Sequence, residues 1–511
     1  MKPGTIAILV ARLVFLVAGY ALVVGLTHFL APADFGLYSL VNGIVALVNM
    51  VLMSGAMQTV SHFVAADDNT APRLRPRFLV YQAIIAGLAV GGLGALSYVL
   101  PGFFKEPSVG PLLQIALFIP AACALYAVNV GYLNGHRCFV RQAALDILFS
   151  ILKVSAMLTL AGLGFGVMGV FGGFAIAAIT SLIASFLLTQ NGAPCPSAGA
   201  VRGATTGFAP AAAPSASSSI ERVDFMPFAQ YAVPIMGVAL LLNAVFHADL
   251  FLLKNLTRSA QESGALTGVY AAAQQIARIP YYGMGTVGII VFPSIAALSS
   301  KHTVDRPAHR SNRGRVADIG SAALGGALNL MLGMSAIAMP LSGELMHLIY
   351  PELYQAGATA LAVLIASAAA LTILYLATTV ISSAGFPRVS LLFLSITLTL
   401  QTAFALMFIP KWSMVGAAFA TLAASSGVAC LALRWLRVKL DVQISAFYLA
   451  RCFLAASIPG ALACAFHAAA LGASSRIATL IFLMIDAMLF IVLSLVLGTL
   501  RPRRRTTPPN P

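Results

Sequence analysis

Residues 5–29 form the segment TIAILVARLVFLVAGYALVVGLTHF, in which Arg12 is the one Lys, Arg, Asp or Glu residue. As a helix, a segment of this length spans about 37 Å, enough to cross a hydrocarbon core of about 30 Å. Lipid offers the backbone no hydrogen-bond partner, so the segment is predicted to be a transmembrane helix. It is longer than the apolar region of a signal peptide and no A-x-A site follows it, which favours a first membrane span.

Apolar segments of similar length recur along the whole chain. Hydrophobic residues make up 60% of the 511 positions and charged residues 9%, too few charges for a soluble protein of this size. The sequence therefore predicts an all-α, polytopic membrane bundle of about fourteen transmembrane helices. The predicted spans are 5–29, 36–63, 78–100, 111–133, 143–164, 168–189, 228–253, 268–298, 318–341, 357–383, 389–409, 414–434, 446–468 and 477–500.

The Lys and Arg residues are distributed unevenly between the two sides of these spans. Of the 30, 21 lie in loops or termini on one side and five lie on the other, while four fall within spans. The positive-inside rule places the side with 21 in the cytoplasm, together with both termini. The net charge of +15 is thus interpreted as a topology signal and not as a nucleic-acid site. The four basic residues within spans are Arg12, Lys153, Arg278 and Arg451.

The chain is predicted to divide at a segment rich in Ala, Pro, Ser and Gly, residues 191–227, interpreted as a flexible cytoplasmic linker. Short motifs recur in order on both sides of it: Gly36-Leu37-Tyr38 opens the second span and Gly268-Val269-Tyr270 opens the eighth. Two parallel six-helix lobes follow, with the substrate path expected between them. The predicted parts are an N-lobe at 1–190, the linker at 191–227, a C-lobe at 228–440, two further helices at 441–500 and a basic cytoplasmic tail at 501–511.

Charges inside the membrane are the strongest indication of a site, because each costs about 2.5–3.5 kcal/mol on insertion scales. Arg12, Lys153 and Arg278 are predicted to line a cationic cavity, which suits an anionic substrate such as a pyrophosphate. Pro280 is expected to bend the eighth span beside Arg278. Further candidate substrate-binding residues lie on the same stripe of that span: Gln274, Gln275 and Tyr282.

The alternative is that each buried cation pairs with a nearby acid. Asp146 and Asp249 are candidate partners in the two lobes, and for Arg451 in the last helix pair a salt bridge to Asp486 is the favoured interpretation. Asp249 has a second possible role, because a carboxylate within a membrane can carry protons or bind Na⁺. It is the candidate for ion coupling.

No catalytic motif is present in the sequence. There is no Walker A loop, no H-E-x-x-H and no G-x-S-x-G, so the chain is predicted to be a transporter and not an enzyme. We expect no cofactor and no metal site, and transport driven by an H⁺ or Na⁺ gradient, by the substrate gradient or by a partner. The six cysteines have no paired spacing and are interpreted as apolar fillers instead of disulfides or metal ligands.

Two segments carry a family resemblance. LAPADFGLYSLVNGIVALVNMVLMSGAMQTVSHFVA at 30–65 and GVYAAAQQIARIPYYGMGTVGIIVFPSIAAL at 268–298 resemble the polysaccharide transporter family, the Wzx-type O-antigen flippases of the MOP exporter superfamily. The resemblance covers most of residues 5–440. It implies a MATE-like bundle that moves an undecaprenyl-pyrophosphate-linked oligosaccharide across the bacterial inner membrane by alternating access. A polysaccharide polymerase and chain-length machinery are implied as partners, besides the lipid bilayer and the lipid-linked glycan.

Three other functions remain open at this point. A MATE-type drug exporter would favour acidic cavity residues, whereas the candidate cavity is cationic. A lipid II flippase is compatible with the same charges. A membrane glycosyltransferase or ligase needs a large periplasmic loop or an acidic catalytic pair, which the predicted loops do not provide.

Overall fold

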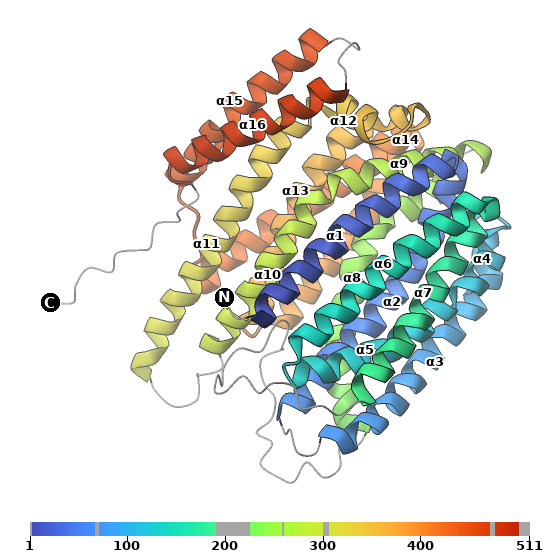
Figure 1. Cartoon of the computed structure of the whole chain (residues 1–511). Coiled ribbons are helices and arrows are strands. Elements are labelled where there is room, and N and C mark those ends of the chain that lie inside the picture. The colour runs from blue at the N-terminus through green and yellow to red at the C-terminus, as the bar shows by residue number, and fades with distance from the viewer. Residues whose placement is uncertain are drawn as a thin grey trace. The chain divides into compact units, whose positions relative to one another are not determined.

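The protein is described by a computed structural model at residues 3–66, 71–190, 225–257, 260–299, 306–470 and 476–499. Within these ranges all regular secondary structure is helical, which confirms the predicted all-α class (Figure 1). The helices are α1 (Pro3–Phe29), α2 (Pro32–Ala66), α3 (Ala71–Phe104), α4 (Val109–Ala116), α5 (Phe118–Gly135), α6 (Phe139–Leu160), η1 (Ala161–Phe165), α7 (Gly166–Gln190), α8 (Phe225–Leu256), α9 (Ala260–Ala277), α10 (Ile279–Ser299), α11 (Arg306–Ala338), α12 (Ser342–Ile349), η2 (Glu352–Gly357), α13 (Ala358–Ser383), α14 (Pro387–Leu440), α15 (Ala446–Ala470) and α16 (Arg476–Val496).

Eleven helical segments among the described residues are long and apolar enough to cross a membrane. Two of them, Phe139–Thr189 and Pro387–Leu440, have 51 and 54 residues and would be about 77–81 Å long if straight. Each instead folds back on itself, so the eleven segments account for thirteen crossings. The predicted span at 268–298, which consists of most of α9 and α10, would be the fourteenth.

Side-chain contacts locate these two reversals. In α14, Gln401 Nε2 donates a hydrogen bond of 2.9 Å to Thr421 Oγ1, although twenty residues of straight helix would separate them by about 30 Å. The helix therefore turns back between them, at Ser413, which has a φ of 44°. Likewise Lys153 of α6 lies 4.2 Å from the ring centroid of Phe174 in α7, with the η1 turn between the two helices.

Contacts divide the described chain into two compact units. The first contains α1 to α8 and α9 as far as Ala271, and the second continues from Ala272 through α16. The predicted lobes at 1–190 and 228–440 stay a prediction. Residues 191–224 of the predicted linker lie outside the described residues. The predicted tail at 501–511 lies outside them as well.

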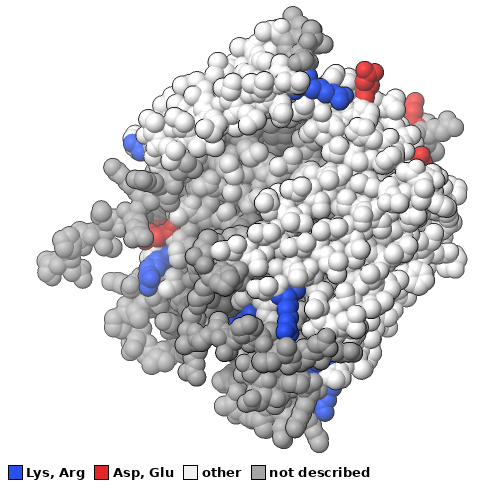
Figure 2. All heavy atoms as spheres, in the orientation of Figure 1, with Lys and Arg blue, Asp and Glu red and all other residues white. Residues whose placement is uncertain are grey.

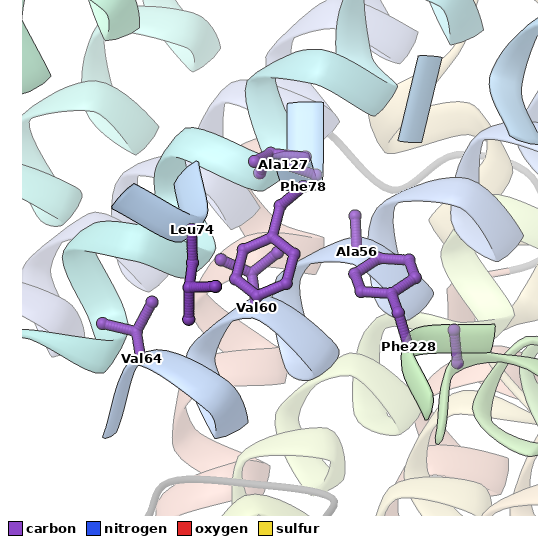
Figure 3. Close-up of a cluster of buried hydrophobic side chains, with 9 residues drawn as sticks. Ala56, Val60, Val64, Leu74, Phe78, Ala127 and Phe228 are labelled. Carbon is purple, nitrogen blue, oxygen red and sulfur yellow. The ribbon is translucent and has the colours of Figure 1, made fainter. Parts of the chain in front are cut away.

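An apolar cluster holds α8 in the first unit (Figure 3). Phe228 of α8 stacks on Phe78 of α3 with ring centroids 5.5 Å apart. Both rings are fully buried beside Ala56 and Val60 of α2 and Ala127 of α5. Four helices thus meet at one core.

The backbones of α2 and α9 approach each other closely at two glycines. A Cβ atom added at Gly268 would lie 1.8 Å from the Pro32 carbonyl oxygen, and one added at Gly36 would lie 2.3 Å from the Gly264 carbonyl oxygen. Only glycine allows this contact, which is the close packing that small residues give membrane helices. The two recurring motifs predicted to open the second and eighth spans therefore meet each other.

In the second unit, α15 and α16 form an antiparallel pair, the terminal hairpin, which packs along α11 (Figure 1). Apolar side chains fill the contact, among them Ile337 of α11, Ala455 and Ala456 of α15 and Phe490 of α16. Most of the described surface visible in Figure 2 carries no Lys, Arg, Asp or Glu, as expected for helices that face lipid.

Candidate substrate-binding residues

Lys153 lies well inside α6, several residues from either end of this membrane helix. Its ammonium group sits over the Phe174 ring at 4.2 Å, a cation–π contact, and its side chain is partly buried. Among the described residues, Lys153 forms no ion pair with a carboxylate. The simple alternative of an acid partner therefore does not explain this lysine.

Arg12 and Asp146 belong to the same unit and interact electrostatically, because α1 packs along α6. The Asp146 carboxylate also accepts a 3.3 Å hydrogen bond from Tyr126 Oη of α5. The Arg12 side chain is exposed within the described unit, so the acid does not enclose it. Sequence reasoning had Asp146 as a candidate partner but gave no signal for Tyr126, since twenty residues and a helix change separate the two.

Arg278 stands at the junction of α9 and α10. The helix is interrupted at this residue, as predicted from Pro280, although the Arg278 N–H still donates to the Gln274 carbonyl oxygen at 3.1 Å. The Arg278 side chain is 7% exposed and therefore lies within protein and not in lipid. Its charge acts on the neighbouring Tyr281, whose ring packs edge-on against Tyr375 of α13 at 5.4 Å.

The other three predicted residues of this stripe differ in burial. Gln274 is buried, Gln275 is partly buried and Tyr282 is exposed. Gln274 and Arg278 are thus both buried, whereas Tyr282, one helical turn beyond Arg278, is exposed. The six predicted substrate-binding residues are divided between the units, with Arg12 and Lys153 in the first and the others in the second. Their role in substrate binding stays a prediction.

Asp249, the predicted coupling residue, is 2% exposed in α8. Its carboxylate accepts hydrogen bonds from Tyr270 Oη of α9 at 2.7 Å and from the Leu250 N–H at 2.8 Å. These donors stabilise the ionised form and join α8 to α9. An ion-coupling role for Asp249 stays a prediction.

Two further charged groups are held in ways the sequence did not indicate. Arg75 of α3 donates to Asn129 Oδ1 from Nε at 3.2 Å and from Nη2 at 3.0 Å, and it also bonds Thr189 of α7. Its guanidinium lies 5.6 Å from the ring centroids of both Tyr132 and Phe186. In the sequence, Arg75 counts only among the cytoplasmic charges that set the topology. In the structure its hydrogen bonds join α3 to α5 and α7.

Lys254 of α8 is the other such group. It is 3% exposed and forms a 3.1 Å salt bridge with Glu106, 148 residues earlier in the chain. The sequence placed Lys254 at the end of a span as an external charge. No local pattern identifies a partner at such a separation.

No group of three or more His, Cys, Asp or Glu residues that could hold a metal ion occurs in the described part of the chain. Cys123, Cys430, Cys452 and Cys464 are free. Cys138 is disulfide-bonded, so the interpretation of all six cysteines as fillers is wrong at this residue. Spacing alone could not reveal it.

Comparisons with known proteins agree with this architecture. Residues 26–197 match the family described as polysaccharide biosynthesis protein. Among solved structures, the lipid II flippase MurJ in an inward closed conformation is similar with a TM-score of 0.70 and 14% identity, over 96% of this chain and 98% of that one. None of the curated proteins matches the sequence.

Two other solved structures extend the likeness. A MOP superfamily transporter from Pyrococcus furiosus, whose binding pocket is described as reversed in polarity, has a TM-score of 0.61 and 14% identity over 86% of this chain and 95% of that one. An inward-facing multidrug resistance MATE transporter has a TM-score of 0.62 and 13% identity over 86% and 98%.

The chain has the many long apolar helices of a multi-pass membrane protein, and its fold is similar to those of MurJ and the MATE transporters. The match of residues 26–197 to a polysaccharide biosynthesis family agrees with the resemblance drawn from the sequence, and the MurJ-like fold extends over 96% of the chain.

Proposed function

We propose that this protein is a flippase for an undecaprenyl-pyrophosphate-linked oligosaccharide, such as an O-antigen, capsule or exopolysaccharide unit. It would move this lipid from the cytoplasmic to the periplasmic leaflet of the bacterial inner membrane by alternating access. The charge asymmetry of the loops supports an orientation with both termini in the cytoplasm. A polysaccharide polymerase and chain-length machinery would act on the delivered glycan.

The observation that carries this proposal is the placement of basic side chains within predicted membrane spans. The chain also matches a polysaccharide biosynthesis family at residues 26–197. Arg278 is buried within protein, and Lys153 contacts an aromatic ring in place of an acid. Guanidinium and ammonium groups bind phosphate oxygens strongly where water is excluded. A substrate linked to a pyrophosphate would bind to these guanidinium and ammonium groups.

A lipid II flippase is the second candidate, favoured by the likeness to MurJ over nearly the whole chain. Its substrate also carries a pyrophosphate, so cavity charge does not separate the two. No cofactor is proposed for either function. We also propose that transport is coupled to H⁺ or Na⁺, with Asp249 as the candidate residue that binds the ion.

Deleting the gene and analysing lipid extracts tests the proposal. An oligosaccharide flippase predicts undecaprenyl-linked oligosaccharide accumulating on the cytoplasmic leaflet, whereas a lipid II flippase predicts lipid II accumulating there. A glycan ligase predicts lipid-linked glycan on the periplasmic leaflet. Unchanged lipid-linked glycans with raised drug sensitivity would replace the proposal with a drug exporter.

Complementation with variants tests the cationic site. Arg278→Ala should reduce export while membrane insertion stays normal, and Arg278→Lys should restore part of it because charge remains without the bidentate geometry. Arg388→Ala, which removes a loop cation, is the matched control. Normal export by Arg278→Ala would exclude Arg278 from the substrate path.

A further inference from the structure

Asp486 is a carboxylic acid sealed inside the terminal hairpin. It is 1% exposed, and neither of its oxygens has a hydrogen-bond partner among the described residues. Phe482 and Phe490, one helical turn away on either side, belong to the apolar cluster between α11, α15 and α16. The carboxyl group therefore lies on an apolar face.

The predicted salt bridge from Arg451 to Asp486 is wrong, and the register of the hairpin explains why. Phe466 of α15 stacks on Phe482 of α16 with centroids 4.1 Å apart, and a Cβ atom at Gly498 would lie 3.8 Å from Arg451 Nη1. The two contacts place Asp486 opposite residues 462 and 463, respectively. Arg451 lies eleven or twelve residues earlier in α15, a separation of about 16–18 Å along the helix axis.

Arg451 has its own contact, because its guanidinium carbon lies 4.2 Å from the ring centroid of Phe447. The helices that pack against α16 carry other titratable or charged groups, of which Cys464 lies closest to the level of Asp486 along the hairpin. On α15 they are Tyr448, Cys452, Cys464 and His467; on α12, Glu344 and His347; and on α11, within its described side chains, Arg315 and Asp318. None of them forms an ion pair or hydrogen bond with Asp486.

An ionised carboxylate without donors or counter-charge is strongly disfavoured in such surroundings, whereas a protonated acid is tolerated. Asp486 differs in this from Asp249, which receives two hydrogen bonds, and from Asp146, which has Tyr126 and Arg12 nearby. These surroundings favour the protonated form of the Asp486 carboxyl group, so Asp486 is a candidate for binding a proton.

A second acid, Glu344, lies on α12, a helix that contacts α16, and it is bonded to an exposed histidine. Glu344 Oε1 of α12 is 2.7 Å from Nδ1 of His467, whose side chain is 57% exposed. The other carboxylate oxygen of Glu344 is buried and has no hydrogen-bond partner in the described chain. The Phe466–Phe482 stack places His467 opposite residue 481, five residues or about 7 Å along α16 from Asp486.

We propose that Asp486 is a proton-binding site, loaded from water through the Glu344–His467 pair. The imidazolium of His467 gives its Nδ1 proton to Glu344 Oε1 and regains one from bulk water. The neutral Glu344 carboxyl group then gives that proton to the Asp486 carboxylate, which becomes a neutral acid, and Glu344 returns to its ionised form. The reverse sequence releases the proton, and no other reactant is consumed.

This site names H⁺ as the coupling ion, and that part of the inference rests on the proposed function. In the predicted topology the His467 end of the hairpin faces the periplasm, so protons would enter there as the glycan lipid leaves the cytoplasmic leaflet. Proton binding itself does not depend on which substrate is moved.

Labelling with N,N′-dicyclohexylcarbodiimide tests the site in the full chain, reconstituted in vesicles of phosphatidylethanolamine and phosphatidylglycerol. This apolar reagent adds a protonated carboxyl group across its C=N bond and leaves a stable acylurea, located by mass spectrometry. Asp486 should be labelled at neutral pH, and Asp318, an exposed carboxylate of α11, should not. Asp486→Asn, which keeps the side-chain shape, should lose the label and the infrared band of a protonated carboxyl group.

Sidedness tests the path. Raising the pH only on the His467 side should decrease labelling of Asp486, and Glu344→Gln should abolish this dependence, while the same change on the opposite side should have little effect. No labelling would overturn the proposal, because the acid would then be ionised or sealed. Labelling of Asp486 that does not depend on the pH of either side would also overturn the proposal. Asp486 would then be a permanently protonated acid with a structural role. A flippase assay that fails while labelling succeeds would refute the proposed function alone.

Discussion

Replacing Gly268 with alanine should force α2 and α9 apart. The new Cβ atom would lie 1.8 Å from the Pro32 carbonyl oxygen, 2.7 Å from the Pro32 carbonyl carbon and 2.9 Å from the Gly36 nitrogen. All three are backbone atoms and cannot rotate away. A carbon–oxygen contact needs about 3.3 Å, so the helices must separate by about 1.5 Å. Overpacking of this kind costs about 1–3 kcal/mol, which reduces the population of the packed arrangement about 5- to 150-fold.

Gly264 provides the matched control, one helical turn earlier on α9. A Cβ atom there meets nothing closer than 3.6 Å, so Gly264→Ala adds the same methyl group without a clash. Thermal unfolding of the purified full chain in detergent should give a lower midpoint for Gly268→Ala than for wild type or Gly264→Ala, and glycan export should follow the same order. Equal midpoints and equal export for the two alanine variants would refute backbone contact between α2 and α9.

Other predictions concern single charged or strained residues. Glu106→Gln should destabilise the protein by about 3–5 kcal/mol, because it leaves Lys254 buried without its carboxylate, and adding Lys254→Met should restore most of the unfolding midpoint. Ser413→Gly should raise that midpoint, because a backbone with φ 44° and ψ −120° costs a non-glycine residue about 1–3 kcal/mol; a lower midpoint would contradict this strain. Lys153→Met should reduce export more than Lys153→Arg at equal membrane levels, and equal export by both would remove the charge at position 153 from the mechanism.

The membrane fold could be predicted from the sequence because its main determinant is local. A segment such as residues 5–29 must be helical and must cross the bilayer wherever it lies in the bundle. Pro280 likewise acts on its own helix, and the chain is interrupted beside it at Arg278 as expected. The predicted spans at 389–409 and 414–434 likewise correspond to the two arms of α14, between which the chain reverses at Ser413.

The site was less predictable, because partners depend on register between helices far apart in the chain. Arg451 and Asp486 look like a pair in the sequence, yet the Phe466–Phe482 stack sets them about 16 Å apart. Conversely, the salt bridge of Lys254 to Glu106 joins residues that no periodicity connects. Composition identified Arg278 as a buried charge but not Lys254, and only packing shows what each charge touches.

The contact between Gly36 and Gly268 also gives a physical reason for the repeated motif. The two glycines occupy the same place in the motifs at 36–38 and 268–270, and each lies against backbone of the other helix. Both positions must be small at once, because a methyl group added at either one would meet backbone atoms that cannot move aside. A double variant with alanine at both positions should therefore be less stable than either single variant, since each methyl group adds its own clash.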